Sequence, residues 1–172
     1  DIANQDMALI NSFVERIGKE ISQELADSLV LSVGSTPSVF YHSNPNNSAR
    51  LEIHPGNYTL FDRQQLWSGA CVDESAVAGR VVSTVIGQYE SRIILDAGAT
   101  ALTKEQTPQG GWGSIGSNPE LDCYKLSQEI MLVRGENLKR FPIGSVVSIL
   151  PNHSCLAAAC FEEYYIIDDP SN

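Results

Sequence analysis

The sequence has no apolar stretch approaching the roughly 20 residues of a membrane-spanning helix. Positive charge is also scarce: 11 Lys and Arg stand against 21 Asp and Glu, so the formal net charge is -10. Phosphate backbones and acidic lipid surfaces bind cationic proteins, so this balance argues against nucleic acid or a membrane as a partner.

Cysteine is sparse, and no two of the four cysteines form a C-x-x-C pair. A chain of 172 residues is too long to depend on a disulfide framework. Residues 1–10 contain no basic region and no signal-like apolar core, so we expect reduced thiols in a cytoplasmic protein. Because the sequence does not begin with Met, we also expect it to be part of a longer protein.

The first third of the chain has the pattern of an α/β protein. Residues 6–26 carry apolar side chains at helical spacing, which predicts one amphipathic helix. Residues 29–33 are apolar apart from Ser32 and predict a strand buried on both faces, ended by Gly34 and Pro37. Helix, strand and glycine turn in this order are typical of a parallel sheet or barrel. The predicted buried face of the helix contains Ile10, Phe13, Val14, Ile17, Ile21 and Leu25.

The pattern changes to that of an all-β domain farther along the chain. Residues 39–49 are rich in turn formers, and residues 50–62 alternate as a strand interrupted at Pro55 and Gly56. Residues 77–98 predict a hairpin, because two apolar runs flank a turn. A glycine-rich loop is predicted at residues 107–120, and further strands at residues 124–135, 144–150 and 162–168.

The stretch "SVGSTPS", residues 32–38, is a candidate anion-binding turn. Gly34 allows a sharp turn that leaves amide groups free to point at an anion, and Ser35 and Thr36 add hydroxyl groups. This composition suits a phosphate at the carboxyl end of a barrel strand. An ordinary turn that ends the strand is the alternative.

The stretch "HPGNY", residues 54–58, is a second break after a strand. Pro55 and Gly56 interrupt the pairing, and Tyr58 adds an aromatic ring with a hydroxyl group. A bulge at a sheet edge is the alternative interpretation of this stretch.

The stretch "PNHSC", residues 151–155, places an imidazole two residues before a thiol. If residues 152–157 are extended, His153 and Cys155 point to the same face. Imidazole and thiolate both bind zinc, and a site with so few protein ligands leaves positions for water or substrate. A surface histidine beside a buried cysteine is the alternative.

Two further residues allow more than one role. Asp96 follows a predicted strand and is a candidate ligand, base or turn residue. Trp112 lies among glycines and suits either a lid over a pocket or a packed aromatic. The sequence contains no Ser-His-Asp or Walker-type pattern that would point to another chemistry.

Taken together, these stretches resemble one enzyme family. "SVGSTPS", "HPGNYTLFD", "VVSTVIGQYESRIILDAGATALTKE" and "VVSILPNHSC" occur in the order found in eukaryotic-type D-serine dehydratases and the related D-threonine aldolases. The resemblance runs from about Ser28 to Tyr165, so it covers most of the chain.

The resemblance implies an alanine-racemase-like fold, with an N-terminal barrel that holds pyridoxal phosphate and a C-terminal β domain. A whole (β/α)8 barrel needs roughly 250 residues. Residues 1–60 would therefore supply the C-terminal units of the barrel, and residues 61–172 the antiparallel β domain with the metal site. The missing N-terminal barrel half and a second copy in a homodimer are the implied protein partners.

The resemblance also assigns site residues. The family's phosphate-binding loop matches Gly34, Ser35 and Thr36. Its second cofactor-contacting turn matches Gly56, Asn57 and Tyr58. The zinc ligands of the dehydratases match His153 and Cys155. None of the four lysines stands in the context of the family's pyridoxal lysine, so that residue is expected outside this chain and the fragment alone is expected to be inactive; these lysines are Lys19, Lys104, Lys125 and Lys139.

The implied activity is that of a lyase, which converts the small D-amino acid D-serine to pyruvate and ammonia with pyridoxal phosphate and zinc. The aldolases, which make a retro-aldol cleavage, typically have aspartate as their second metal ligand, so Cys155 favours the dehydratase. A non-catalytic β-domain fragment is a further alternative. The sequence departs from the family at His54, where arginine is usual, and at Ile130 and Met131, where a histidine-glycine pair is often found.

Overall fold

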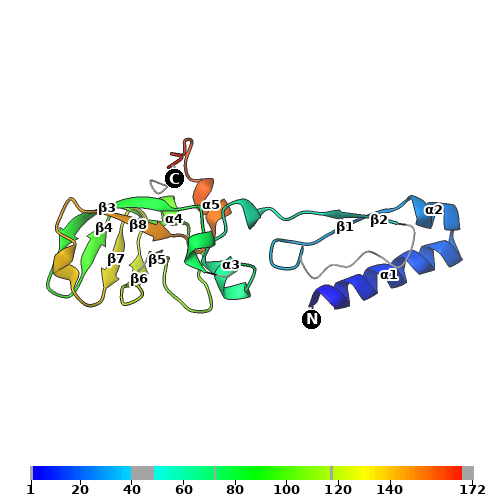
Figure 1. The fold of residues 1–172 in the computed structure, drawn as a ribbon, viewed down its shortest axis with the longest axis horizontal. Coiled ribbons are helices and arrows are strands. Elements are labelled where there is room, and N and C mark those ends of the chain that lie inside the picture. Colours follow the sequence, from blue (N-terminus) through cyan, green and yellow to red (C-terminus); the bar gives the residue numbers. More distant parts are fainter. Residues whose placement is uncertain (1, 40–48, 72, 117, 168–172) are drawn as a thin grey trace. The chain divides into compact units, whose positions relative to one another are not determined.

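The computed structural model describes residues 2–39, 49–71, 73–116 and 118–167 (Figure 1). These residues form two compact units. The first unit comprises Asp1–Thr59 with Ser68–Ala70, and the second, which we call the sheet unit, comprises Leu60–Trp67 with Cys71–Asn172. Each unit is described by itself.

The N-terminal helical region of the first unit is split in two. Helix α1 spans Ile2–Glu20 and helix α2 spans Gln23–Ser28. The hydroxyl oxygen of Ser22 accepts a hydrogen bond from the Leu25 amide at 3.2 Å and caps α2. The prediction of one continuous helix over residues 6–26 is therefore wrong, because a serine N-cap starts a new helix where the spacing alone suggested continuation.

The apolar face of these helices is only partly as predicted. Val14 is buried, and Ile10 and Ile17 pack against the cluster that it forms with Ala26, Leu31 and Ala49. The side chains of Phe13, Ile21 and Leu25 are instead 58%, 69% and 42% exposed. The break at Ser22 starts a new helix, so Leu25 leaves the face that the spacing assigned it, whereas Phe13 is exposed within α1 itself.

The two strands described in the first unit are parallel. Strand β1, Val30–Val33, pairs with strand β2, Arg50–Ile53, and helix α1 lies along them in Figure 1. Burial along β1 alternates, with Leu31 and Val33 buried, so the prediction of a strand buried on both faces is wrong. The predicted loop at residues 39–49 lies almost wholly outside the described residues. Because the strands are parallel, the turns that follow them meet at one edge.

The sheet unit is built on six antiparallel strands in the order β5-β8-β3-β4-β7-β6 (Figure 1). Strands β3 and β4 form the hairpin that the sequence predicted. The Trp112 amide donates to the Cys123 carbonyl at 3.1 Å, which links the segment before β5 to β6 and leaves the sheet nearly closed. The strands are β3 (Val81–Gln88), β4 (Ile93–Leu95), β5 (Ser114–Ile115), β6 (Asp122–Leu126), β7 (Met131–Arg134) and β8 (Val146–Leu150).

The core of this unit follows the two-residue period of its strands. Burial along β3 alternates strictly, and Val85, Leu95, Met131 and Ile149 are fully buried in one cluster. Each such side chain contributes roughly 1.5–3 kcal/mol when it leaves water. Trp112 packs against this cluster, so the interpretation as a packed aromatic is the correct one.

Short helices complete the sheet unit. They are α3 (Arg63–Ser68), η3 (Glu74–Ala76), α4 (Ala99–Leu102), η4 (Leu138–Arg140) and α5 (Ser154–Ala158), and η2 (Asn57–Thr59) follows β2 in the first unit. No helix in the described part of the chain is long and apolar enough to cross a membrane.

The prediction of a strand at residues 162–168 is wrong for residues 162–167, which are the ones that the structure describes. Residues 162–167 pair with no described strand, and Tyr165 and Ile166 are 90% and 93% exposed. The Tyr164 hydroxyl instead donates to the Ala158 carbonyl at 2.8 Å, which holds the segment beside the end of α5. A β-prone sequence forms a strand only where a neighbouring edge accepts its hydrogen bonds.

Candidate functional site

The turns after β1 and β2 meet through one hydrogen bond. Gly34 has φ +93°, in the left-handed region that glycine favours, and it lets the chain leave β1 sharply. Thr36, which is 2% exposed, accepts the Asn57 amide on its hydroxyl oxygen at 2.9 Å. This bond joins the two turns that the sequence singled out, and all six predicted cofactor-binding residues lie on them.

This paired turn carries small and hydroxyl-bearing residues of the kinds that contact phosphate groups, but the amides of Ser35 and Asn57 already bond to Ser38 and Thr36. Gly34, Ser35 and Gly56 are exposed, and a Cβ at Gly56 would meet no heavy atom within 4 Å. The Ser38 hydroxyl binds the Ser35 amide at 3.1 Å and lies 3.3 Å from the Ser35 hydroxyl, so the first turn is held by its own serines. Tyr58 follows Gly56 by two residues, and its side chain is 55% exposed. Small, polar and glycine-bearing turns at the carboxyl ends of parallel strands fit a phosphate group.

The segment "PNHSC" ends β8 and begins α5. His153 has extended backbone, φ -139° and ψ 104°, and is the N-cap residue, so Cys155 lies in the first turn of the helix. The assumption that residues 152–157 are extended is therefore wrong, because His153 and Cys155 lie at a strand-to-helix junction. The His153 side chain is 28% exposed, and Cys155 is exposed.

A buried carboxylate fixes the start of α5. Asp62 is fully buried and accepts two backbone amides, that of Ser154 at 2.8 Å and that of Gln65 at 2.9 Å. Because Asp62 precedes α3, one side chain holds the first turns of α3 and α5 together. The position of the His153–Cys155 segment is thus set by an interaction across 92 residues of sequence.

A buried amide fixes the other side of the segment. Asn152 is 1% exposed and donates to the carbonyls of Glu105 at 2.8 Å and Gly111 at 3.0 Å. Its own oxygen accepts Arg63 Nη1 at 2.7 Å, and Arg63 also donates to the carbonyl of Gly113. Burial removes water from the Arg63 guanidinium and thereby lowers its pKa. The Asn152 amide oxygen and the Gly113 carbonyl accept its hydrogen bonds in place of water. The glycine-rich loop is therefore ordered around the residue that precedes His153.

Glu105 binds the imidazole directly. Its Oε2 atom lies 2.6 Å from Nδ1 of His153 and accepts Gln64 Nε2 at 3.0 Å. The hydrogen bond from His153 is the main cause that lowers the pKa of Glu105. An ionised carboxylate accepts hydrogen bonds and cannot donate them, so Nδ1 carries the proton and Nε2 is the ring nitrogen left for another partner. Sequence reasoning missed this role of Glu105, because 48 residues separate it from His153 and no spacing signal connects them.

The side chains at this junction are of the types that bind zinc. Imidazole nitrogen and thiolate sulfur are common zinc ligands, and a carboxylate on the far nitrogen of a metal-binding histidine is the usual second partner. Within the described residues, no group of three or more His, Cys, Asp or Glu side chains could hold a metal ion. His153 and Cys155 thus present two protein donors, which would leave coordination positions for water or substrate.

Asp96 has a structural role. It accepts the Ser83 hydroxyl and the Thr84 amide, each at 2.7 Å, and so ties the end of β4 to β3. Of the three roles that the sequence allowed, these contacts support that of a turn residue.

The chain matches proteins of known name across most of its length. Residues 78–167 match the family described as "Putative serine dehydratase domain", which is more than half of the chain. The D-serine dehydratase of Schizosaccharomyces pombe is 36% identical over 155 residues, which are 80% of this chain and 37% of that protein. The chain therefore spans less than two fifths of the length of that relative.

Solved structures show the same fold. An alanine racemase-like protein from Idiomarina loihiensis superposes with a TM-score of 0.66 at 31% identity, over 76% of this chain and 38% of that one. A cysteine-to-alanine mutant of D-threo-3-hydroxyaspartate dehydratase, in the metal-free form, gives a TM-score of 0.67 at 28% identity, over 77% and 39%. The predicted family and the predicted fold class, barrel units followed by an antiparallel β domain, are both confirmed. The chain belongs to the serine dehydratase domain family, within the alanine-racemase-like fold.

Proposed function

We propose that this chain is the C-terminal part of a D-serine dehydratase that depends on pyridoxal phosphate and zinc and releases pyruvate and ammonia from D-serine. The observation that carries the proposal is the junction of β8 and α5, where a carboxylate-bound histidine precedes a cysteine by two residues. The relative from fission yeast bears the name of this activity, and the present chain corresponds to 37% of its length.

In this proposal, His153 and Cys155 would hold the zinc ion. The His153 nitrogen Nε2 and the Cys155 sulfur are the donors, since Nδ1 is occupied by Glu105. When bound, zinc supplies a Lewis acid for the substrate hydroxyl group, which is a poor leaving group. Asp62 and Asn152 hold the backbone of the segment that bears both donors. The metal-free form of the cysteine-to-alanine mutant of the hydroxyaspartate dehydratase is in keeping with a cysteine ligand.

The paired turns of the first unit would hold the phosphate of the cofactor. When bound, pyridoxal phosphate supplies an electron sink for the bond-breaking steps at the α-carbon. The residues of this chain would anchor it: Gly34, Ser35 and Thr36 on one turn, and Gly56, Asn57 and Tyr58 on the other. The lysine that carries the cofactor and moves the α-proton is proposed to lie elsewhere in the protein. Assembly as a homodimer stays a prediction.

The proposal is tested on the full-length protein by measuring zinc content and pyruvate release from D-serine on the same samples. We expect stoichiometric zinc and pyruvate release in the parent, and loss of both in His153→Ala and Cys155→Ala. Cys160→Ala is the matched control, because Cys160 is also an exposed thiol near α5, and its sulfur lies 3.4 Å from the Leu156 carbonyl. Zinc-free parent protein that still releases pyruvate would contradict the zinc role.

D-threo-3-hydroxyaspartate is a second candidate substrate, since a dehydratase of that name shares the fold at 28% identity. Elimination of water from this substrate, followed by hydrolysis of the resulting imine, gives oxaloacetate and ammonia, whereas D-serine gives pyruvate and ammonia by the same two steps. Parallel assays with both substrates therefore separate the two. Release of glycine and an aldehyde from D-threonine would instead support the aldolase alternative.

A further inference from the structure

We propose that Glu105 is a positioning residue for the metal site, which holds the imidazole of His153 so that Nε2 faces outward as the metal donor. This inference rests on the proposed function and adds a residue to it. Glu105 lies after α4, distant in sequence from both proposed ligands, and it would contact neither metal nor substrate.

The first step is the chemistry of the contact. The distance of 2.6 Å between His153 Nδ1 and Glu105 Oε2 is that of a strong charge-assisted hydrogen bond. A neutral imidazole has one nitrogen that donates and one that accepts. Because the carboxylate takes the donor at Nδ1, the acceptor lone pair is at Nε2, and a metal ion needs that lone pair.

The second step is that Glu105 is itself held at both ends. Its carboxylate accepts Gln64 Nε2 from α3 at 3.0 Å, and its backbone carbonyl accepts Asn152 Nδ2 at 2.8 Å. Asn152 is the chain neighbour of His153, so Glu105 and the histidine segment are joined by two separate bonds. A ring bound in this way has little freedom to turn Nδ1 toward an ion.

The third step separates positioning from stability. The side chains of His153 and Glu105 are 28% and 42% exposed, and a polar contact with this much solvent around it contributes little to folding. The buried groups Asp62 and Asn152 already secure the backbone of the segment. The contact of Glu105 with the imidazole is therefore expected to matter for metal affinity far more than for the folded state.

The experiment measures zinc affinity of the full-length protein by competition with a chromophoric chelator, together with the absorption spectrum of its cobalt-substituted form. We expect Glu105→Ala to weaken zinc binding by about 10–100-fold, the usual effect of removing such a partner. Glu105→Gln keeps an acceptor oxygen without the charge, so its loss should be smaller, below about tenfold. The cobalt bands should shift in Glu105→Ala, because the ring is no longer fixed.

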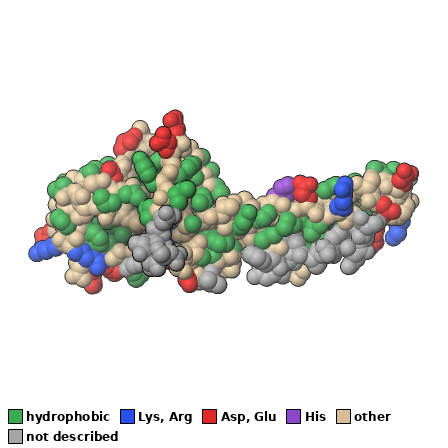
Figure 2. Space-filling model, turned by 45° about the horizontal axis from the view of Figure 1, so that its top comes forward, with side chains coloured by type: hydrophobic (Ala, Val, Ile, Leu, Met, Phe, Trp, Pro, Cys, Tyr) green, Lys and Arg blue, Asp and Glu red, His purple; other side chains and the backbone are tan. Residues whose placement is uncertain are grey.

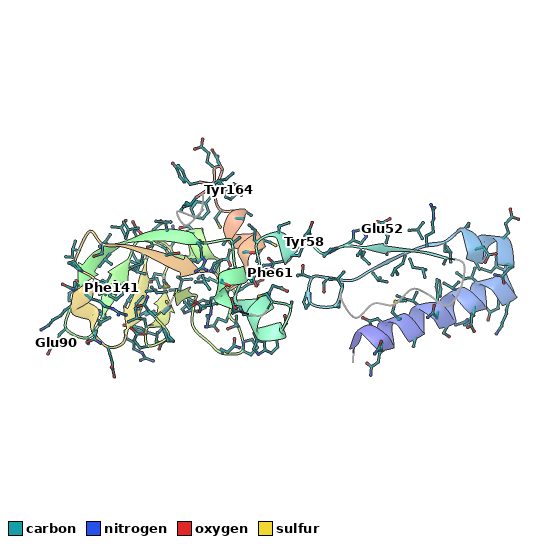
Figure 3. All side chains as sticks on the ribbon, viewed as in Figure 1. Glu52, Tyr58, Phe61, Glu90, Phe141 and Tyr164 are labelled. Atoms are coloured by element: carbon teal, nitrogen blue, oxygen red, sulfur yellow. The ribbon has the colours of Figure 1, made fainter. Side chains whose placement is uncertain are left out.

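Glu90→Gln is the matched control. Glu90 lies in the turn between β3 and β4, at the end of the sheet unit away from α5 (Figure 3). The Glu90→Gln substitution removes the same charge as Glu105→Gln and should leave zinc affinity and the cobalt spectrum unchanged. Equal losses in the two Gln variants would mean that net charge alone acts, which would overturn the inference.

The outcomes keep this inference apart from the proposed function. Zinc bound by the parent, lost in His153→Ala and unchanged in Glu105→Ala would overturn the positioning role alone. A parent that binds no zinc would overturn both. If Glu105→Ala does not fold, Glu105→Gln decides: unchanged affinity and unchanged cobalt bands in that variant overturn the inference, and a weaker, shifted site supports it.

Discussion

The four cysteines divide into two buried and two exposed side chains. Burial raises the pKa of the Cys123 thiol to about 12, and burial is also the main cause that raises the pKa of Cys71. Cys155 and Cys160 are both exposed on and after α5. Because the thiolate is the reactive form, the two pairs should differ strongly in reactivity.

This difference can be measured by alkylation of the native full-length protein at pH 8, with peptide mass spectrometry to identify each modified cysteine. With a pKa of about 12, only about one in ten thousand Cys123 side chains is a thiolate at this pH. We expect Cys155 and Cys160 to react first, and Cys71 and Cys123 to react only after denaturation. Added zinc should protect Cys155 and leave Cys160 reactive; equal protection of both would count against a specific site.

At the element scale, β3, β4 and β8 were predicted from the sequence, but the strand predicted at residues 124–135 is divided between β6 and β7, and β5 lies in the predicted loop at residues 107–120. The hairpin of β3 and β4 was predicted because two apolar runs flank a turn. In the structure, burial alternates along β3 because successive side chains of a strand point to opposite faces. The helices α2 and α5 were missed because each begins at a local cap or buried carboxylate, Ser22 for α2 and Asp62 for α5, that apolar spacing does not record. The contact of Glu105 with His153 could not be predicted, since only the folded sheet brings them together.

The hairpin of β3 and β4 also carries a pH-dependent contact at Asp96. Burial would raise the pKa of Asp96, but the Ser83 hydroxyl and the Thr84 amide together lower it below its usual value. A carboxyl whose pKa is lower in the folded state adds stability above its unfolded pKa and loses it as pH falls through the folded value. The contribution of Asp96 is thus complete at neutral pH and lost below about pH 4.

Asp96→Asn tests this contact. Discounted for solvent exposure, its cost should be about 0.5–1 kcal/mol in the free energy of unfolding at pH 7. The difference from the parent should shrink toward zero as the pH falls below about 3. Urea unfolding monitored by tryptophan fluorescence at both pH values provides the measurement. A difference that stays constant with pH would show that the charge of Asp96 is not involved; Glu90→Gln controls for removing a carboxylate from the same hairpin.

At the scale of the whole molecule, the candidate sites are divided between the two units. The candidate phosphate-binding turns belong to the first unit, and the junction of β8 and α5 belongs to the sheet unit. The family resemblance of the sequence suggested residues for both candidate sites because it rests on short sequence motifs. The first unit has only a small cluster around Val14 and Leu31, whereas the sheet unit has a large cluster that runs from Val81 to Ala157. The sheet unit therefore contains within itself the burial that folding requires.

We accordingly predict that residues 60–172 fold without the rest of the protein. All contacts described around His153, including those of Asp62, Asn152 and Glu105, lie within these residues. The outward faces of β3 and β8 keep exposed apolar side chains, Val82 at 64% and Val146 at 66%, and hydrophobic side chains are visible on the surface in Figure 2. These should lower solubility rather than prevent folding, because the buried faces of the same strands form the core.

The expressed fragment should show one cooperative urea transition and slow amide exchange at β3, β4 and β7, the strands at the centre of the sheet. Residues 1–59, expressed in the same way, serve as the comparison and should show little protection, because two parallel strands and two helices bury too little surface. If the fragment is soluble but lacks a cooperative transition, the sheet unit depends on other parts of the full-length protein for its fold. The histidine and cysteine would then be positioned only in the full-length protein, and any zinc site would form together with that fold rather than before it.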